Sequence, residues 1–245
     1  MELKFSDSRL RFILGSVDDP DHCLRACDGV DGIIHAAALK RIQSGLHQPW
    51  VMTQINAGGT ENIANAARDM GVHSVVLVSS DKAHAPAQGS YGASKLIAES
   101  IFLGRAWHRL PRHPLYHVVR YGNVWGSTGS VVPRWRSVLN GGGGGIRVTS
   151  TEATRFFMDK EEAVGFVLGA LNGEHPPGMV AIPDWLPAYR VGDLIEAMEI
   201  KDYEITGLPY YEKLHECMGA KNEDGSYFTS EHARRMSVEE LRAYL

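Results

Sequence analysis

The chain has 245 residues, of which 44% are hydrophobic and 22% charged, and its formal net charge is −4. This composition is typical of a globular protein and excludes disordered and fibrous classes. Its basic residues are scattered rather than clustered, so the sequence predicts no nucleic-acid groove. It contains no run of 18 apolar residues, so no membrane span is expected.

The N-terminal residues and the cysteines predict a reduced, cytoplasmic protein. The first seven residues lack the apolar core of a signal peptide, so secretion is not expected. The three cysteines, Cys23, Cys27 and Cys217, include no Cys-x-x-Cys pair and predict neither a disulfide framework nor a zinc site. We therefore expect free thiols and a cytoplasmic location.

The first half of the chain alternates predicted strands and helices. Strands are expected over residues 10–17, 32–36, 72–79 and 115–121, and helices over 49–71 and 91–109, with a further helix start at 18–21. The strand over 72–79 is nearly continuous in β-branched residues, as in parallel strands covered on both faces. This order predicts an α/β fold with a doubly wound parallel sheet.

After Tyr121 the pattern loosens. Helices are expected over 131–139, 159–171 and 191–198, and a short strand over 179–182. A last helix begins at Ser237 with a capping box, in which Glu240 reaches back. The five glycines at 141–145 follow a helix and lack the strand-to-helix context of a phosphate loop, so we interpret them as a surface loop.

Three polar clusters lie at the edge of the predicted sheet. Residues 79–82 and 120–123 follow two predicted strands, and Tyr91 and Lys95 lie four apart at the start of a helix, on one face. A lysine ammonium beside a phenol lowers the phenol pKa toward values useful for a general base. Because the carboxyl ends of parallel strands meet at one edge, these clusters are expected to converge on a single crevice.

These motifs carry a resemblance to a known family. The segments that match, in chain order, are residues 11–15, 35–40, 56–62, 80–83, 91–95, 120–124, 129–133, 154–156 and 212–216. The chain resembles the extended short-chain dehydrogenase/reductase family, and within it the inverting UDP-N-acetylglucosamine 4,6-dehydratases. The Tyr-x-x-x-Lys spacing marks only the superfamily, whereas Asp81-Lys82 is more specific to the dehydratases.

The resemblance implies a Rossmann-like sheet without its first strand-helix-strand, and a small C-terminal substrate-binding lobe. The cofactor domain would comprise residues 1–125, with 155–185 returning to it. The substrate-binding lobe would comprise 126–154 and 186–245. Family members commonly pair through two long helices, here 49–71 and 91–109, so a homo-oligomer is expected.

The resemblance also implies a reaction. Members oxidise C4 of a nucleotide sugar with NADP or NAD, eliminate water across C5 and C6, and return the hydride to C6. Tyr91 would take the C4 hydroxyl proton, and Lys95 would hold the cofactor ribose and lower the pKa of Tyr91. Lys82 would remove the C5 proton, its pKa depressed by burial and by nearby Lys95. Asp81, with a raised pKa, would protonate the departing C6 hydroxyl.

The resemblance also implies binding residues, at the positions of this sequence that match those of the family. The cofactor-binding residues implied are Val17, Ala36, Ala37, Ala38, Lys40, Ser79, Tyr91, Lys95 and Tyr121. The substrate-binding residues implied are Ser80, Asn123, Val131, Thr149, Arg155 and Glu212. An arginine fork pairs bidentately with diphosphate oxygens, which suits Arg155. His35 is interpreted as a packing histidine, and no metal site is assigned.

The sequence departs from the family at its start. The Thr-Gly-x-x-Gly-x-x-Gly loop that cradles the cofactor pyrophosphate is absent. We therefore expect this chain alone to bind NADP weakly or not at all, and micromolar affinity by isothermal titration would contradict that. The Arg-Pro-Gly that precedes Glu-Lys in the family is replaced by Pro209-Tyr210-Tyr211. The choice between NADP and NAD stays open, because its selector lies in the absent segment.

Two alternatives to the dehydratase remain. The absent phosphate loop favours a non-catalytic relative that binds nucleotide sugars. A UDP-sugar 4-epimerase or reductase is the third reading, which Asp81-Lys82 argues against. The dehydratase reading places the chain in surface polysaccharide biosynthesis, with a nucleotide sugar as its partner and neither nucleic acid nor membrane.

Overall fold

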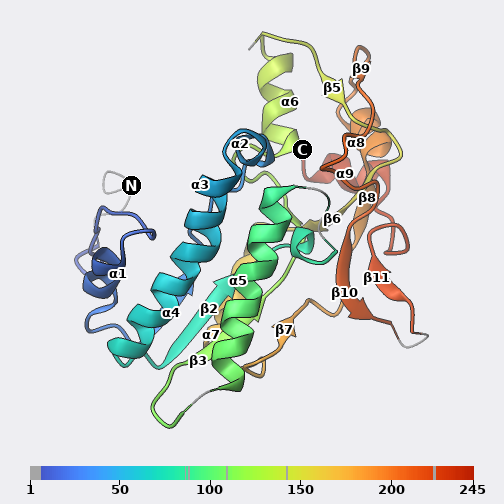
Figure 1. Ribbon diagram of the computed structural model, residues 1–245. Helices are drawn as coiled ribbons and strands as arrows, with labels where there is room; N and C mark the ends of the chain where they lie inside the picture. The colour runs from blue at the N-terminus through green and yellow to red at the C-terminus, as the bar shows by residue number, and fades with distance from the viewer. Residues whose placement is uncertain (1–6, 86, 88, 109, 142, 223–224) are drawn as a thin grey trace.

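A parallel sheet lies at the centre of the first half of the chain (Figure 1). The computed structural model describes residues 7–245 except 86, 88, 109, 142, 223 and 224. The sheet has the order β1-β2-β3-β7, and its strands are β1 (Gly32–His35), β2 (Ser74–Val78), β3 (Leu115–Val119) and β7 (Val180–Ala181). Every neighbouring pair is parallel, which confirms the predicted fold class.

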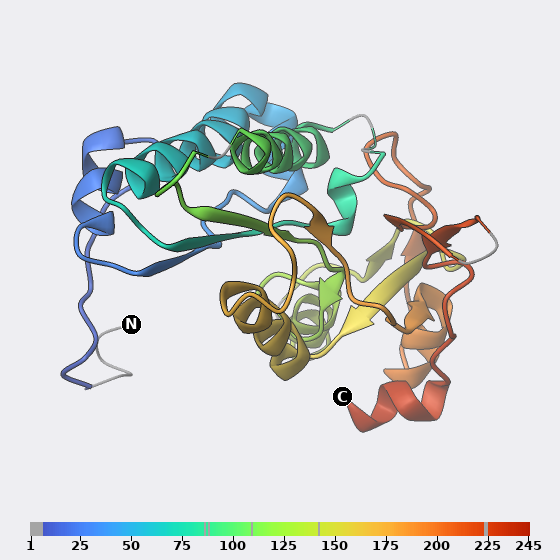
Figure 2. The same cartoon turned by 90° about the horizontal axis from the view of Figure 1, so that it is seen from below.

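Helices cover both faces of this sheet, as Figure 2 shows. On one face lie α4 (Gly59–Asp69) and α5 (Ser90–Trp107), with α1 (Pro20–Cys27) packed against α4, and on the other lies α7 (Lys160–Leu171). Successive residues of a strand point to opposite faces. Accordingly Val75 packs in the core beneath α5, whereas Val76 packs against α7. Burial on both faces explains the unbroken apolar run in β2.

The predicted helix over 49–71 is divided into three parts. It comprises α3 (Pro49–Thr53), a π-helical turn η2 (Gln54–Gly58) and α4, and the short helix α2 (Ile42–His47) precedes them. The π-helical turn contains the buried Asn56, which accepts a hydrogen bond from Leu39 N at 2.7 Å and donates to Leu39 O at 3.1 Å. π-Helical turns often occur at functional sites. This one fixes the loop that follows β1.

The second half forms a lobe around smaller sheets. Its strands are β4 (Asn123–Val124), β5 (Arg147–Val148), β6 (Thr154–Met158), β8 (Ala188–Arg190), β9 (Glu204–Ile205), β10 (Cys217–Lys221) and β11 (Tyr227–Thr229). Its helices are α6 (Val131–Leu139), α8 (Val191–Ala197) and α9 (Val238–Ala243). Trp135, Phe157, Leu194 and Leu241 share one buried core among these elements.

The predicted capping box at Ser237 is confirmed, and α7 begins with a second one that was not predicted. Asp159 caps α7 and Ser237 caps α9, each with a reciprocal bond from the glutamate three residues on. The acidic helix start at residues 18–21 is confirmed too, since Asp19 caps α1 by accepting from His22 N at 3.1 Å. The predicted last residue of the helix over 91–109 lies outside the described residues, and α5 ends at Trp107.

The predicted strand over residues 10–17 is wrong. These residues form no ladder with any described strand, and Leu14 is 99% exposed. A strand needs a hydrogen-bonding neighbour, and β1 pairs with β2 alone among the described strands. Residues 10–17 do not pair with the open edge of β1, and the segment therefore stays outside the sheet.

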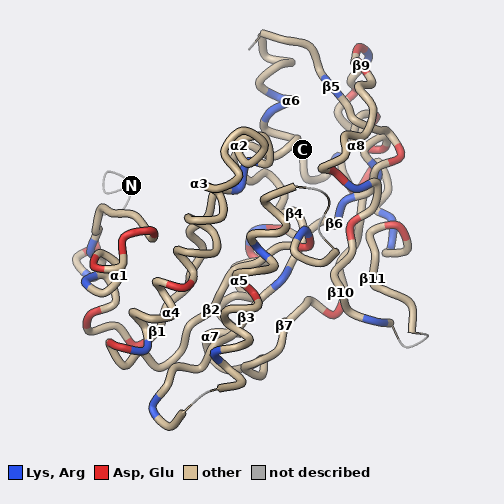
Figure 3. The backbone as a smooth tube through the Cα atoms, viewed as in Figure 1, with Lys and Arg blue, Asp and Glu red and all other residues tan. Residues whose placement is uncertain are grey.

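Arg120 takes part in a buried ion pair and also links the central sheet to the lobe by a hydrogen bond. Arg120, which follows β3, contacts Glu99 of α5 and donates from Nη1 to Met218 O of β10 at 2.6 Å. Elsewhere basic and acidic residues are spread over the whole chain, as Figure 3 shows. Within the described ranges, no helix has both the length and the apolar character needed to cross a membrane.

Candidate active site

The carboxyl ends of β2 and β3 position the Ser80-Asp81-Lys82 segment. Asp81 N donates to Tyr121 O at 3.1 Å, which joins the segment to the chain beyond β3. A short 3-10 helix η3 (Asp81–Ala83) follows, and its cap Ser80 accepts from Lys82 N at 3.3 Å. The predicted convergence of the strand-end clusters at one edge is therefore observed.

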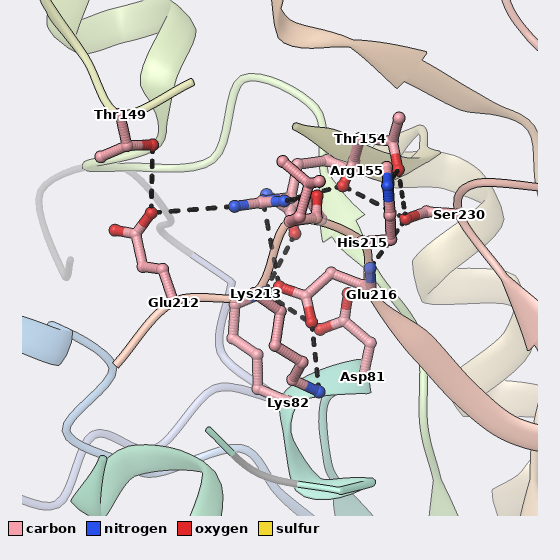
Figure 4. Close-up of polar contacts among 12 residues, drawn as sticks. Asp81, Lys82, Thr149, Thr154, Arg155, Glu212, Lys213, His215, Glu216 and Ser230 are labelled. Atoms are coloured by element: carbon pink, nitrogen blue, oxygen red, sulfur yellow. Dashed lines mark hydrogen bonds and ion pairs between the residues drawn. The ribbon is translucent and has the colours of Figure 1, made fainter. Parts of the chain in front are cut away.

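Lys82 lies between two carboxylates. Its Nζ is 3.1 Å from Asp81 Oδ1 and 3.3 Å from Glu216 Oε1, as Figure 4 shows. Asn123 Oδ1 accepts a third contact from the same ammonium at 3.4 Å. Although burial acts to lower it, the pKa of Lys82 is raised by the two carboxylates. The expected depressed pKa is therefore wrong, because adjacent anions outweigh burial and any effect of Lys95.

Asp81 has the raised pKa that the sequence analysis expected. The side chain is fully buried, and burial raises its pKa, with the Glu216 carboxylate acting in the same direction and Lys82 against them. Ser80 Oγ donates to Asp81 Oδ1 at 2.9 Å. Asp81 Oδ2 has no hydrogen-bond partner among the described atoms. A buried carboxyl of this kind is suited to hold a proton and donate it.

Tyr91 and Lys95 both come from the first two turns of α5. Burial raises the pKa of Tyr91, and the cation that acts to lower it is Lys82. The expectation that Lys95 lowers the pKa of Tyr91 is wrong, since Lys95 Nζ instead donates to Val78 O at 2.6 Å. Burial lowers the pKa of Lys95 itself to about 8, with Glu99 opposing.

Two neighbouring cavities meet at these residues. Lys82, Tyr91 and Asn123 line both of them. The larger, about 310 Å³, is also lined by most of the residues expected to bind the cofactor: Ala36, Ala38, Lys40, Ser79, Lys95 and Tyr121. The smaller, about 190 Å³, is also lined by Arg155, Glu212, Lys213 and Glu216. We therefore call the larger cavity the sheet-edge cavity and the smaller one a lobe-side cavity.

A third cavity extends the lobe side. It has a volume of about 470 Å³ and shares Tyr211 and Glu212 with the smaller cavity. Thr149, Arg134 and Arg147 line it, and Thr149 Oγ1 donates to Glu212 Oε2 at 3.3 Å. Arg155 lies nearby, with its Nη2 3.8 Å from the same Glu212 oxygen (Figure 4). Arginines beside a groove of this size suit an anionic ligand such as a diphosphate.

Three expected binding residues do not line these cavities. Val17 packs against the core near α1, and its carbonyl accepts from Asn62 Nδ2 at 2.9 Å. Val131 packs against the core of the lobe, and Ala37 is exposed. His35 is buried with Nε2 3.0 Å from Thr60 Oγ1, and burial lowers its pKa to about 4, as befits a packing histidine.

The sheet-edge cavity fits the nicotinamide end of a dinucleotide. Small side chains at Ala36 and Ala38 leave room beside the sheet, and Lys95 and Tyr91 place polar groups at the wall. Lys40 lies at the mouth, where its Nζ donates to Thr128 O at 2.6 Å. These groups can hold ribose hydroxyls and a planar ring.

Sequence reasoning gave no role to Glu216 and Lys213. Both lie in the matched segment 212–216, of which only Glu212 was assigned a function. Glu216 is only 2% exposed, yet it forms ion pairs with Lys82, Arg155 and Lys213. The sequence signal for these roles is the charge of the segment 212–216. It gives little direction by itself, because the residues that pair with Glu216, such as Lys82 and Arg155, lie far away in the sequence.

A parallel sheet with helices on both faces, and a Tyr-x-x-x-Lys pair beside a crevice at its carboxyl edge, define the short-chain dehydrogenase/reductase fold. Residues 1–240 match the family described as "Polysaccharide biosynthesis protein", and the chain belongs to that family.

Individual relatives agree with this assignment. The chain is 33% identical over 228 residues to a UDP-N-acetylglucosamine 4,6-dehydratase (inverting) of Campylobacter jejuni, covering 93% of this chain and 67% of that protein. It is 33% identical over 175 residues to a UDP-glucose 4-epimerase of Rickettsia conorii, covering 71% of this chain and 51% of that protein. The X-ray structure of Pen from Bacillus thuringiensis matches with a TM-score of 0.90 and 26% identity, over 99% of this chain and 83% of that chain.

Proposed function

We propose that this chain is a nucleotide-sugar dehydratase that converts UDP-N-acetylglucosamine to a UDP-4-keto-6-deoxy-hexosamine for surface polysaccharide biosynthesis. The observation that supports it best is that Lys82 and Tyr91 line both cavities, while the buried Asp81 carboxyl lies directly behind Lys82, 3.1 Å from its Nζ. A base and a phenol then face one space, with a carboxyl acid in contact with the base, and these are the groups that elimination next to an oxidised carbon requires.

The sheet-edge cavity is proposed to take NADP or NAD, in keeping with the family. A nicotinamide bound there would accept a hydride from C4 and return it at C6. Lys95 would hold the ribose, and Ala36, Ala38 and Lys40 would line the approach. The division into a cofactor domain and a substrate-binding lobe is part of the same proposal.

Tyr91 and the Asp81–Lys82 pair would handle the protons. Tyr91, whose phenolate is favoured by the Lys82 ammonium against the effect of burial, would take the C4 hydroxyl proton, and Ser80 would hydrogen-bond the C4 oxygen. Lys82 must be neutral before it can take the C5 proton, and its proton can pass to Asp81 across their 3.1 Å contact. That transfer yields an amine and a carboxylic acid together, which are the base and acid that elimination needs.

The proton count closes over one turnover. Lys82 removes the C5 proton while Asp81 gives its proton to the departing C6 hydroxyl, which leaves as water. Lys82 then returns its proton to C5 as the hydride reaches C6. The proton held by Tyr91 then passes to Asp81 and restores its protonated form, so water is the only product besides the nucleotide sugar.

The lobe-side cavities are proposed to bind the UDP part of the substrate. Arg155 would pair with a phosphate oxygen, and Asn123 would contact the sugar diphosphate. Glu212 and Thr149 would hold the uridine side. Two copies of the chain are proposed to pair through α4 and α5, where Leu96 and Ile97 are exposed on α5.

A UDP-sugar 4-epimerase is the second candidate, because one relative with 33% identity carries that name. An epimerase uses the same Tyr and Lys pair but eliminates no water. The Asp81–Lys82 pair would then have no step to perform, and we therefore favour the dehydratase.

The test is a mass measurement. The chain is incubated with UDP-N-acetylglucosamine and NADP⁺, and in parallel with NAD⁺, and the nucleotide sugar is weighed by mass spectrometry. If the chain is a dehydratase, the product is expected to carry a ketone and to be lighter than the substrate by the mass of one water molecule. A product of unchanged mass would support the epimerase instead, and UDP binding without any product would support a non-catalytic module.

A further inference from the structure

Two buried carboxylates face the same lysine in unequal surroundings. Lys82 Nζ lies 3.1 Å from Asp81 Oδ1 and 3.3 Å from Glu216 Oε1, and both carboxylates are almost fully buried (Figure 4). A single ammonium needs only one counter-ion. The second carboxylate is therefore free to carry a proton, and the surroundings decide which of the two it is.

Glu216 is the carboxylate with the cations. Besides Lys82, its Oε1 is 3.9 Å from Arg155 Nε and its Oε2 is 3.5 Å from Lys213 Nζ. Asp81 forms an ion pair with Lys82 only, and its Oδ2 has no hydrogen-bond partner among the described atoms. Negative charge is thus favoured at Glu216, and a proton at Asp81.

We propose that Glu216 is a positioning residue of the dehydratase site: its fixed negative charge beside Lys82 makes Asp81, rather than Glu216, the carboxyl that receives the Lys82 proton and holds it for transfer. This inference rests on the proposed function. At the start of elimination the Glu216 charge keeps Asp81 protonated, and as Lys82 takes the C5 proton the same charge stabilises the ammonium that forms.

The backbone holds Glu216 in place for this task. Glu216 N donates to Ser230 Oγ at 2.8 Å, and Ser230 N donates back to Glu216 O at 2.9 Å. Ser230 is fully buried, and its hydroxyl lies 2.7 Å from Thr154 Oγ1 at the start of β6. The main chain at Glu216 is therefore held by Ser230, which in turn contacts β6, and this holds the residue beside Lys82.

The directions of the pKa values agree with this division of roles. Burial raises the pKa of Asp81. Although burial acts to raise it as well, the pKa of Glu216 is lowered by Lys82, Arg155 and Lys213. The charged and titratable groups around Lys82 and Asp81 come from four elements or loops: Tyr91 of α5, Arg155 of β6, Tyr189 of β8, and Lys213 and Glu216 in the segment before β10.

The test is the pH profile of Glu216→Gln. The acid must be protonated, so activity falls as pH rises through the pKa of Asp81. The base must be neutral, so activity falls as pH drops through the pKa of Lys82. Loss of the Glu216 charge lowers both pKa values, and the optimum of kcat is therefore expected to move to lower pH by about one unit. At the wild-type optimum kcat is expected to fall about tenfold or more, with KM changed less than about threefold.

Two variants serve as comparisons. Glu216→Asp keeps the charge and is expected to restore the wild-type optimum, though at a reduced rate. Glu212→Gln removes a carboxylate that contacts Arg155 and Thr149 but not Lys82. It is expected to raise KM and leave the optimum in place. An optimum that stays at the wild-type pH in Glu216→Gln, or one that moves as far in Glu212→Gln, would overturn the inference.

A second readout does not depend on turnover. In protein labelled with nitrogen-15 at lysine Nζ, the Lys82 signal is assigned from its absence in Lys82→Arg and followed with pH. We expect it to lose its proton at a lower pH in Glu216→Gln than in the wild type. A wild-type chain that makes no keto product yet shows this shift would refute the proposed function alone. An active wild type without the shift would refute the role of Glu216 alone.

Discussion

Replacing Lys82 with alanine is expected to slow formation of the 4-keto-6-deoxy product about 10³-fold, the usual loss when a general base is removed. Tyr91 and Lys95 remain in this variant, so oxidation at C4 is still expected. The absorbance of reduced nicotinamide should therefore rise once and persist, because the hydride has no C6 acceptor. The measurement combines stopped-flow absorbance with product mass.

The control is Lys201→Ala, because Lys201 is an exposed lysine that lines none of the three cavities described above. It is expected to keep the wild-type rate. Lys82→Ala should also stay folded, since Asp81 and Glu216 can take up a proton when the ammonium is gone. A folded Lys82→Ala variant that makes product at the wild-type rate would remove Lys82 from the mechanism.

Glu99→Ala is expected to lower the free energy of unfolding by about 3–5 kcal/mol, the range for breaking a buried ion pair. Glu99 is 1% exposed and accepts from Arg120 Nε at 3.0 Å, with Arg120 itself 6% exposed. Without Glu99 the Arg120 guanidinium stays buried beside Met218 O with no anion to balance it. Urea unfolding measures the loss.

The matched control for this prediction is an exposed pair. Arg68 Nη2 lies 2.8 Å from Asp69 Oδ1 on the surface of α4. The substitution Asp69→Asn is expected to lower the free energy of unfolding by less than about 1 kcal/mol. A loss of the same small size in Glu99→Ala would contradict the account, because it would mean that the buried pair contributes little to stability.

The central sheet could be predicted from the sequence because its signals are local. The apolar run before Ser79 is buried on both faces by α5 and α7, and the predicted capping box of α9 lies within four residues of sequence. The strand over 10–17 had an equally apolar pattern. Strand formation also depends on a neighbour, however, which no local pattern reveals.

The features of the candidate site that could be predicted are likewise the local ones. Residues that follow strand ends, Asp81 and Asn123, were placed correctly because topology brings strand ends together. The pKa of Lys82 was predicted in the wrong direction because its strongest partner besides Asp81 is Glu216, 134 positions further along the chain. Charge contacts across such separations are set by the packing of the lobe on the sheet, not by spacing.

The most direct test of the account is a turnover in deuterium oxide followed by NMR of the product. If Lys82 removes the C5 proton and an exchangeable ammonium returns one, the product must carry deuterium at C5 and have lost the C6 hydroxyl. A product that keeps its original hydrogen at C5 would contradict the proposed roles of Asp81 and Lys82.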